Sequence, residues 1–228
     1  MPDPTFLRPT PYFDFEHPLV REFVELTLQG VQPGEVQRVR ALYLAARDGV
    51  SYNPYVFDTD KGSMRASDVL IHRKSYCIPK AVLLGAAARS IGIPARLGLT
   101  NVRNHLSTPK MLTWLRTEVF AMHGYIELFV EGMWRKATPA FDRVLCERMG
   151  VPPLEFNGLE DSMFQQFSSD GSQFIEYLRD HGRFEDVPID LILASLTEHY
   201  PHIADESVIQ RFRMWDREYR AATFHGMA

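Results

Sequence analysis

Residues 75–100 read SYCIPKAVLLGAAARSIGIPARLGLT, and this stretch decides the fold. Positions 78–91 are rich in alanine and leucine, and Pro79 suits the first turn of a helix. Gly92 stands where the end of a helix favours glycine. The pattern predicts a helix over residues 78–91, with Cys77 at its N-terminus.

A small sheet follows this helix. Residues 95–100 have the composition of a short strand, and residues 118–130 are rich in aromatic and aliphatic side chains of β type. A turn at Glu131-Gly132 leads into residues 133–137. We therefore expect an antiparallel hairpin whose register is fixed by the glycine turn.

Helices are predicted before and after the sheet in the sequence. Apolar residues recur at helical spacing over residues 19–28 and 35–47, whereas residues 51–74 have the composition of a loop with short helical turns. The fold class is α+β: helices first, then a small antiparallel sheet, then more helices. We expect one domain over 1–228, with a core at about 50–145 and a mainly helical extension over 146–228.

Composition narrows the classes of function. The 228 residues are 45% hydrophobic, which suffices for a full core, and their net charge of −4 comes with no basic run that would bind nucleic acid. The first twenty residues lack the basic and apolar regions of a secretory signal, and no apolar run of about 18 residues suggests a membrane span. We expect a cytoplasmic protein that binds neither nucleic acid nor a membrane; its oligomeric state is open.

The two cysteines, Cys77 and Cys146, are expected to be free thiols with different roles. A thiol is a good nucleophile only as thiolate, and its pKa falls at a helix N-terminus or beside an imidazole. Cys77 meets the first condition. Cys146, within Leu-Cys-Glu-Arg, is predicted to be a buried core residue on a helix.

A partner for Cys77 comes from the long strand. Strict alternation places His123, Tyr125 and Glu127 on one face, toward which the helix of Cys77 is expected to pack, with the core on the other face. His123 is the candidate base, and Tyr125 a candidate substrate contact. Glu127 is expected to form a structural salt bridge with Arg96.

The remaining site residues are less defined. Thr138 and Asp142, after the last strand, are the candidates for orienting the imidazole. The Cys77 backbone N–H is the first candidate for an oxyanion hole, and a second donor is expected from Tyr52, Asn53 or Tyr76, which the sequence does not rank.

Taken in order, these residues resemble a known family. Cys77, its helix, the segment GIPAR at 92–96, HGYIE at 123–127 and GMW at 132–134 are similar to the core of the transglutaminase-like superfamily, which has a papain-related fold. The resemblance covers roughly 50–145. The chain as a whole is similar to stand-alone bacterial members.

The resemblance implies a catalytic cysteine at a helix N-terminus, packed against an antiparallel sheet that bears the histidine and an orienting acid. Family members often place Asp four residues after the tryptophan, a position occupied here by Thr138. Asp142 could reach back from the next turn, Thr138 could accept the imidazole hydrogen bond, or the site could be a dyad. We favour Asp142.

The expected activity is acyl chemistry on a peptide, protein or small amide or ester substrate, with no cofactor. Hydrolysis comes first because it requires no second binding site; amine transfer or an intramolecular condensation is the enzymatic alternative. A catalytically silent module that binds a peptide or partner is the alternative from another class. A metal site is not expected, because Cys77, His123, His72 and His105 lack the close spacing of zinc ligands.

Overall fold

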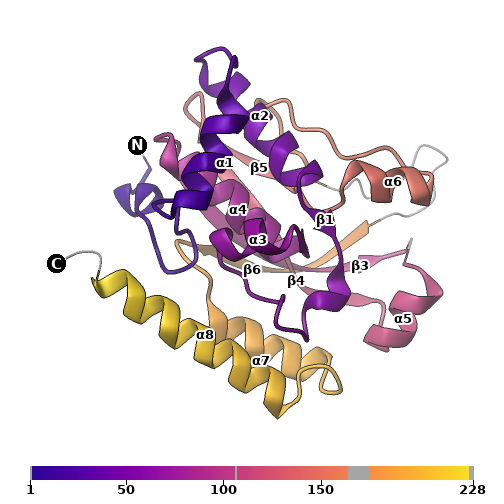
Figure 1. The fold of residues 1–228 in the computed structure, drawn as a ribbon. Helices are drawn as coiled ribbons and strands as arrows, with labels where there is room; N and C mark the ends of the chain where they lie inside the picture. The colour runs from indigo at the N-terminus through magenta and orange to yellow at the C-terminus, as the bar shows by residue number, and fades with distance from the viewer. Residues whose placement is uncertain (1, 106, 164–174, 226–228) are drawn as a thin grey trace.

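The computed structural model describes residues 2–105, 107–163 and 175–225, with side chains to residue 222 (Figure 1). The helices are η1 (Pro4–Leu7), α1 (Pro18–Leu28), α2 (Glu35–Asp48), η2 (Pro54–Val56), α3 (Ala66–His72), α4 (Cys77–Ser90), α5 (Pro109–Leu115), α6 (Arg143–Met149), α7 (Ile189–His199) and α8 (Glu206–His225). The strands are β1 (Ser51–Tyr52), β2 (Lys74–Ser75), β3 (Ala95–Asn104), β4 (Val119–Val130), β5 (Met133–Ala137) and β6 (Ile175–Phe184).

The main sheet has the strand order β5-β4-β3-β6, and every pair in it is antiparallel. The predicted hairpin is confirmed: β4 and β5 pair from Val130↔Met133 to Ile126↔Ala137 around Gly132, whose φ is +80°. β1 and β2 form a separate parallel ladder just before α4. The α+β class with an antiparallel sheet is therefore as expected.

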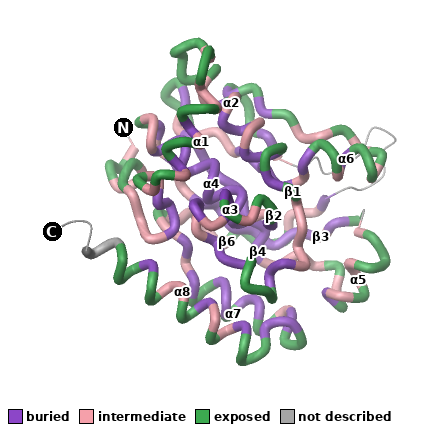
Figure 2. Tube along the Cα trace, viewed as in Figure 1, coloured by how far each residue is buried: buried purple, intermediate pink, exposed green. Residues whose placement is uncertain are grey.

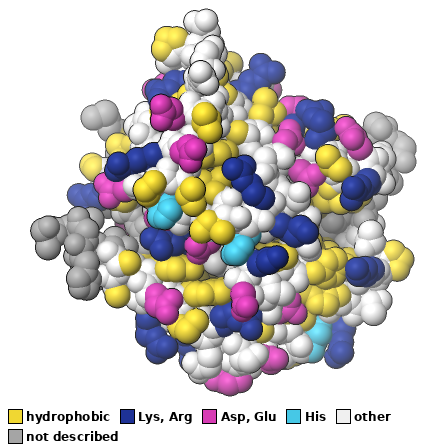
Figure 3. Space-filling model, viewed as in Figure 1, with side chains coloured by type: hydrophobic (Ala, Val, Ile, Leu, Met, Phe, Trp, Pro, Cys, Tyr) yellow, Lys and Arg dark blue, Asp and Glu magenta, His cyan; other side chains and the backbone are white. Residues whose placement is uncertain are grey.

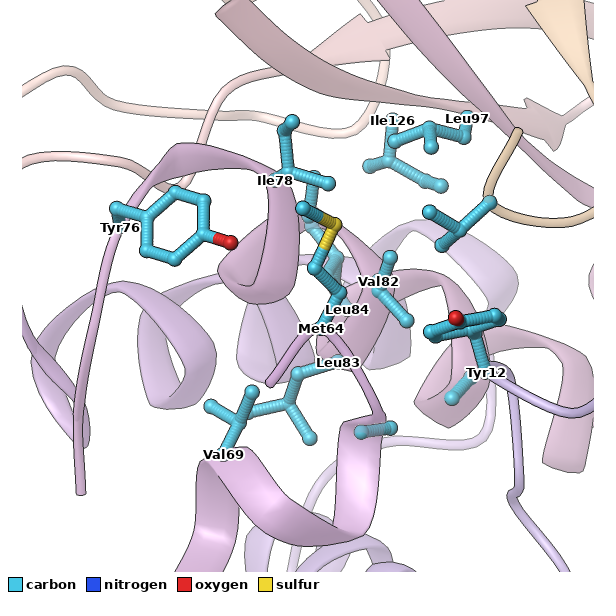
Figure 4. Packing of buried hydrophobic residues seen from close by; sticks show 14 of the residues in the cluster. Tyr12, Met64, Val69, Tyr76, Ile78, Val82, Leu83, Leu84, Leu97 and Ile126 are labelled. Atoms are coloured by element: carbon cyan, nitrogen blue, oxygen red, sulfur yellow. The ribbon is translucent and has the colours of Figure 1, made fainter. Parts of the chain in front are cut away.

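Helix α4 forms the centre of the molecule. All residues from Ile78 to Arg89 are buried, and α4 shows as a purple core helix in Figure 2. Around its first turns, Ile78 and Val82 lie among Met64, Ile126 and Leu97 (Figure 4). A helix that is buried on all sides requires neighbours on all sides, which α1, α2 and α3 provide together with the sheet.

A buried lysine ties α4 to the segment before it. The Lys80 side chain is fully buried, and its Nζ donates to the backbone carbonyls of Arg47 and Val50. Burial lowers the pKa of Lys80 to about 7. The end of α2 is thus held against α4 one turn after Cys77. Strand β1, which carries Tyr52, begins directly after Val50, the second carbonyl that Lys80 binds.

The two C-terminal helices, α7 and α8, lie together along one side of the molecule, away from α1 and α2 (Figure 1). α7 packs against β4. Lys and Arg side chains alternate with Asp and Glu over the face drawn in Figure 3. In the described ranges, no helix combines the length and the apolar content that crossing a bilayer requires.

The helices predicted over 19–28, 35–47 and 78–91 are confirmed within about two residues as α1, α2 and α4. The mainly helical reading of 146–228 missed β6, which adds a fourth strand beside β3, and residues 164–174 of that segment lie outside the described part. β6 has an exposed, charged middle and a break at Gly182, with φ +104°, so it lacks the alternation of a core strand.

Candidate active site

Cys77 is the first residue of α4, as predicted, and it follows Tyr76, which has an extended backbone. Its side chain is half-buried and opens onto a pocket of about 630 Å³, counted with the space at its open mouth. The walls come from β1, the η2 turn, the start of α4, α5, β4 and the end of α7.

His123 reaches the same pocket from β4. The two strands pair Thr100↔His123 and then Val102↔Phe120, so β4 carries one residue more than β3 between these points. Met122, inside this bulge, has φ +57°. Four consecutive residues, 120–123, consequently line the pocket, which strict alternation would not allow.

Two side chains that the sequence analysis missed support the bulge. The Tyr200 hydroxyl accepts a hydrogen bond from the Ala121 N–H at 2.6 Å and donates to the Val119 carbonyl at 2.7 Å. Asn101 Oδ1 accepts from the Met122 N–H at 3.0 Å. No local pattern marks either residue, because a polar group that satisfies a distant backbone is identifiable only once the fold is known.

The apolar surroundings of the site shift the pKa values of both Cys77 and His123. Burial raises the pKa of the Cys77 thiol, although the backbone N–H groups of Gly124, Ile78 and Cys77 favour the thiolate and partly oppose this shift. Burial lowers the pKa of His123 to about 4. Near neutral pH the resting pair is therefore a thiol and a neutral imidazole, contrary to the activated thiolate expected from the helix N-terminus alone.

Asp142 has a structural role that differs from the predicted one. Its Oδ1 caps α6 by accepting from the Leu145 N–H at 3.0 Å, and its Oδ2 accepts from the Tyr52 N–H at 2.7 Å. Within the described residues it forms no hydrogen bond with His123. The reason is local: α6 begins at Arg143, and an aspartate just before it is a preferred helix cap.

Thr138, the alternative orienting residue, is buried at the end of β5. Its hydroxyl donates to the Met163 sulfur at 3.2 Å, and its backbone N–H donates to the Ser162 carbonyl at 3.1 Å. Among the described residues, neither Thr138 nor Asp142 hydrogen-bonds the imidazole.

The three candidate oxyanion-hole donors that precede Cys77 do not all line its pocket. Tyr52 and Tyr76 line the pocket with Cys77, and the Tyr76 hydroxyl donates to the Gly62 carbonyl at 3.0 Å. Asn53 instead uses its Oδ1 to accept from the Tyr55 N–H at the start of η2, and lines a neighbouring cavity.

The expectation that α4 packs on the face of Tyr125 and Glu127 is wrong. A Cβ atom on Gly85 of α4 would lie 2.6 Å from Ile126 Cδ1, so α4 covers the face that carries Gly124 and Ile126. Tyr125 packs over Gly98 on the opposite face, away from Cys77. Gly85 on α4 and Gly124 on β4 have no side chains, so the backbones of the helix and the strand approach closely on this face.

Glu127 is buried and ion-paired, as predicted. Its Oε2 lies 2.6 Å from Arg96 Nη2, and its Oε1 lies 2.6 Å from Arg183 Nε on β6. Cys146 is buried on α6, which confirms its assignment to the core. In the described part of the chain, no three His, Cys, Asp or Glu side chains converge as metal ligands do.

The family model for the transglutaminase-like superfamily matches residues 21–139, which run from α1 through β5 and include Cys77 and His123. No curated protein matches the chain.

A solved structure of a proposed cysteine protease from Cytophaga hutchinsonii aligns with a TM-score of 0.45 at 16% sequence identity. The alignment covers 78% of this chain and 52% of that one, so the match spans about half the length of that protein. With a family match over more than half of its length, the chain belongs to the transglutaminase-like superfamily.

Proposed function

We propose that this protein is a cysteine hydrolase that cleaves a peptide or other amide bond through an acyl-enzyme on Cys77. One observation carries the proposal: Cys77 begins α4 and lines the same pocket as His123, with the Gly124 N–H acting on its sulfur. Membership of the superfamily supports cysteine-based chemistry in general.

The proposed reaction uses two groups. As the Cys77 sulfur attacks the carbonyl carbon, its proton passes to the His123 imidazole, and the imidazolium then gives that proton to the departing amine as the C–N bond breaks. Water next attacks the thioester while His123 takes one of its protons. The C–S bond breaks, the carboxylic acid leaves, and His123 returns its proton to the departing sulfur, which restores the thiol and the neutral imidazole.

The electrostatics favour proton transfer during attack over a preformed ion pair. Burial keeps His123 neutral, with a pKa of about 4, and a neutral imidazole can accept a proton. Burial also raises the pKa of Cys77, so little thiolate is present before the substrate arrives. The backbone N–H groups of Cys77 and Gly124 are our candidates for the oxyanion hole, since both favour negative charge at the sulfur.

An amine in place of water would convert the same acyl-enzyme to a new amide, so acyl transfer uses the same residues. The raised pKa of Cys77 also favours a second candidate, a module that holds a peptide without cleaving it. The three differ in product: an acid and an amine, a new amide, or an unchanged peptide.

The experiment is incubation with a mixed peptide library, read by mass spectrometry, using wild type, Cys77→Ser and Cys146→Ser. The proposal predicts new peptide termini with wild type and Cys146→Ser, and none with Cys77→Ser. Cleavage that persists in Cys77→Ser contradicts it. Peptides that are retained but never cleaved by wild type identify the binding module.

A further inference from the structure

The pocket beside Cys77 has a consistent chemistry. Sixteen of the described residues line it, and none of these is an aspartate, glutamate, lysine or arginine. Most are aromatic or aliphatic, including Phe57, Ile78, Met111 and Trp114. A ligand group that enters here therefore meets mainly apolar surface, with no fixed charge among the described lining residues to pair with.

Two tyrosine hydroxyls of the lining form hydrogen bonds with the protein backbone. The Tyr76 hydroxyl donates to the Gly62 carbonyl, and the Tyr200 hydroxyl bridges Val119 and Ala121. These rings thus present their carbon edges and faces to the cavity while their oxygens hold the backbone. A charged ligand group would lose its water and gain little in return.

The outer walls come from two separate segments. α5 contributes Met111, Trp114 and Leu115, and the end of α7 with the following turn contributes Leu196 and Ile203. The second segment lies beyond residues 21–139, the part that matches the superfamily. Selectivity at this pocket is thus built partly by chain outside the family core.

We propose that this pocket receives the acyl-side group of the substrate, next to the carbonyl that Cys77 attacks, and selects an uncharged apolar side chain, aliphatic or aromatic. The inference rests on the proposed function, because the pocket selects an acyl group only if Cys77 becomes acylated. The Cys77 side chain lines this pocket. When its sulfur attacks a carbonyl carbon, the acyl-side group attached to that carbon is therefore placed next to the pocket.

The test compares two activated esters of equal size and reactivity. The p-nitrophenyl ester of 6-methylheptanoic acid carries an apolar acyl chain, and the mono-p-nitrophenyl ester of adipic acid replaces its branched end with a carboxylate. Release of p-nitrophenolate and the mass of the Cys77 peptide measure acylation. We expect the apolar ester to acylate Cys77 about 100-fold faster, because desolvating an unpaired charge is costly.

A matched pair of variants tests whether the preference for the apolar ester arises in the pocket. Met111 is half-buried on α5 and lines the cavity, whereas Thr113, on the same helix, is exposed and does not line it. Met111→Lys should reduce the preference for the apolar ester at least about tenfold by pairing with the adipoyl carboxylate, and Thr113→Lys should leave it unchanged. Alkylation by iodoacetamide, which has no acyl chain, should be the same in both.

The outcomes separate the two proposals. Equal acylation of Cys77 by both esters in wild type overturns the apolar pocket and leaves the cysteine chemistry intact. A preference that Thr113→Lys reduces as much as Met111→Lys also overturns it. Failure of both esters to acylate Cys77, with iodoacetamide alkylation unaffected by His123→Ala, overturns the proposed function and this inference with it.

Discussion

The backbone of Gly124 lies against the backbone of Ile78, so closely that a Cβ atom on Gly124 would fall 2.8 Å from the Ile78 Cα. These two residues directly follow His123 and Cys77. The contact therefore fixes the distance between the strand and the helix at the point where the candidate base and nucleophile leave their elements.

Gly124→Ala should disrupt this contact. The added methyl group has no space against backbone atoms, so α4 and β4 must separate, at a cost of about 1–3 kcal/mol in unfolding free energy. Activity should fall at least about tenfold, because small displacements of reacting groups slow the chemistry. Urea unfolding and steady-state rates measure the two effects.

Gly98→Ala is the matched control, since a Cβ there would meet the Tyr125 ring on the opposite face of the same sheet. It should lower stability while retaining the rate of the folded enzyme. If both alanine variants lose activity equally at equal stability, the Gly124–Ile78 contact has no special role.

Tyr200→Phe should affect the bulge that positions His123. Loss of the hydroxyl leaves the Ala121 N–H and the Val119 carbonyl without their partner, which costs about 2 kcal/mol and loosens β4 beside the pocket. We expect a lower kcat. Tyr12→Phe, which removes a buried hydroxyl bonded to Asp216, should cost stability with little change in kcat; a kcat unaffected by Tyr200→Phe would rule out the positioning role.

The buried imidazole should make stability depend on pH. Between pH 6.5, its ordinary pKa, and about 4, its pKa in the folded protein, the unfolded chain binds a proton that the folded chain does not. The unfolding free energy of wild type should therefore decrease as pH falls through this range, by up to about 1.4 kcal/mol per pH unit from His123. His123→Gln should lack this contribution. A wild-type minus variant difference that stays flat across the range contradicts a buried neutral His123.

The sequence predicted the elements that local pattern controls. Apolar composition, Pro79 and Gly92 define α4, and the β-rich run with its glycine turn defines β4 and β5. The salt bridge of Glu127 with Arg96 followed from their place in the strands, although its second partner, Arg183, lies on a strand that pattern did not reveal.

What failed depended on long-range context. The bulge at Met122 breaks the alternation from which the faces of β4 were inferred, and its stabilising partner Tyr200 comes 78 positions later in the sequence numbering. The direction of the Cys77 pKa shift also depends on burial of the thiol in the folded protein, which outweighs the effect of the backbone N–H groups at the helix N-terminus. Neither effect can be read from residues next to Cys77.

The most direct test of the account is the rate of iodoacetamide alkylation at Cys77 in wild type and His123→Ala, read by peptide mass spectrometry near neutral pH. Cys146, which is buried, reports in the same sample whether the variant has opened. If His123 accepts the thiol proton during attack, the variant should alkylate Cys77 at least about tenfold more slowly, with Cys146 unchanged. Equal rates at Cys77 in the two proteins would contradict a Cys77–His123 pair.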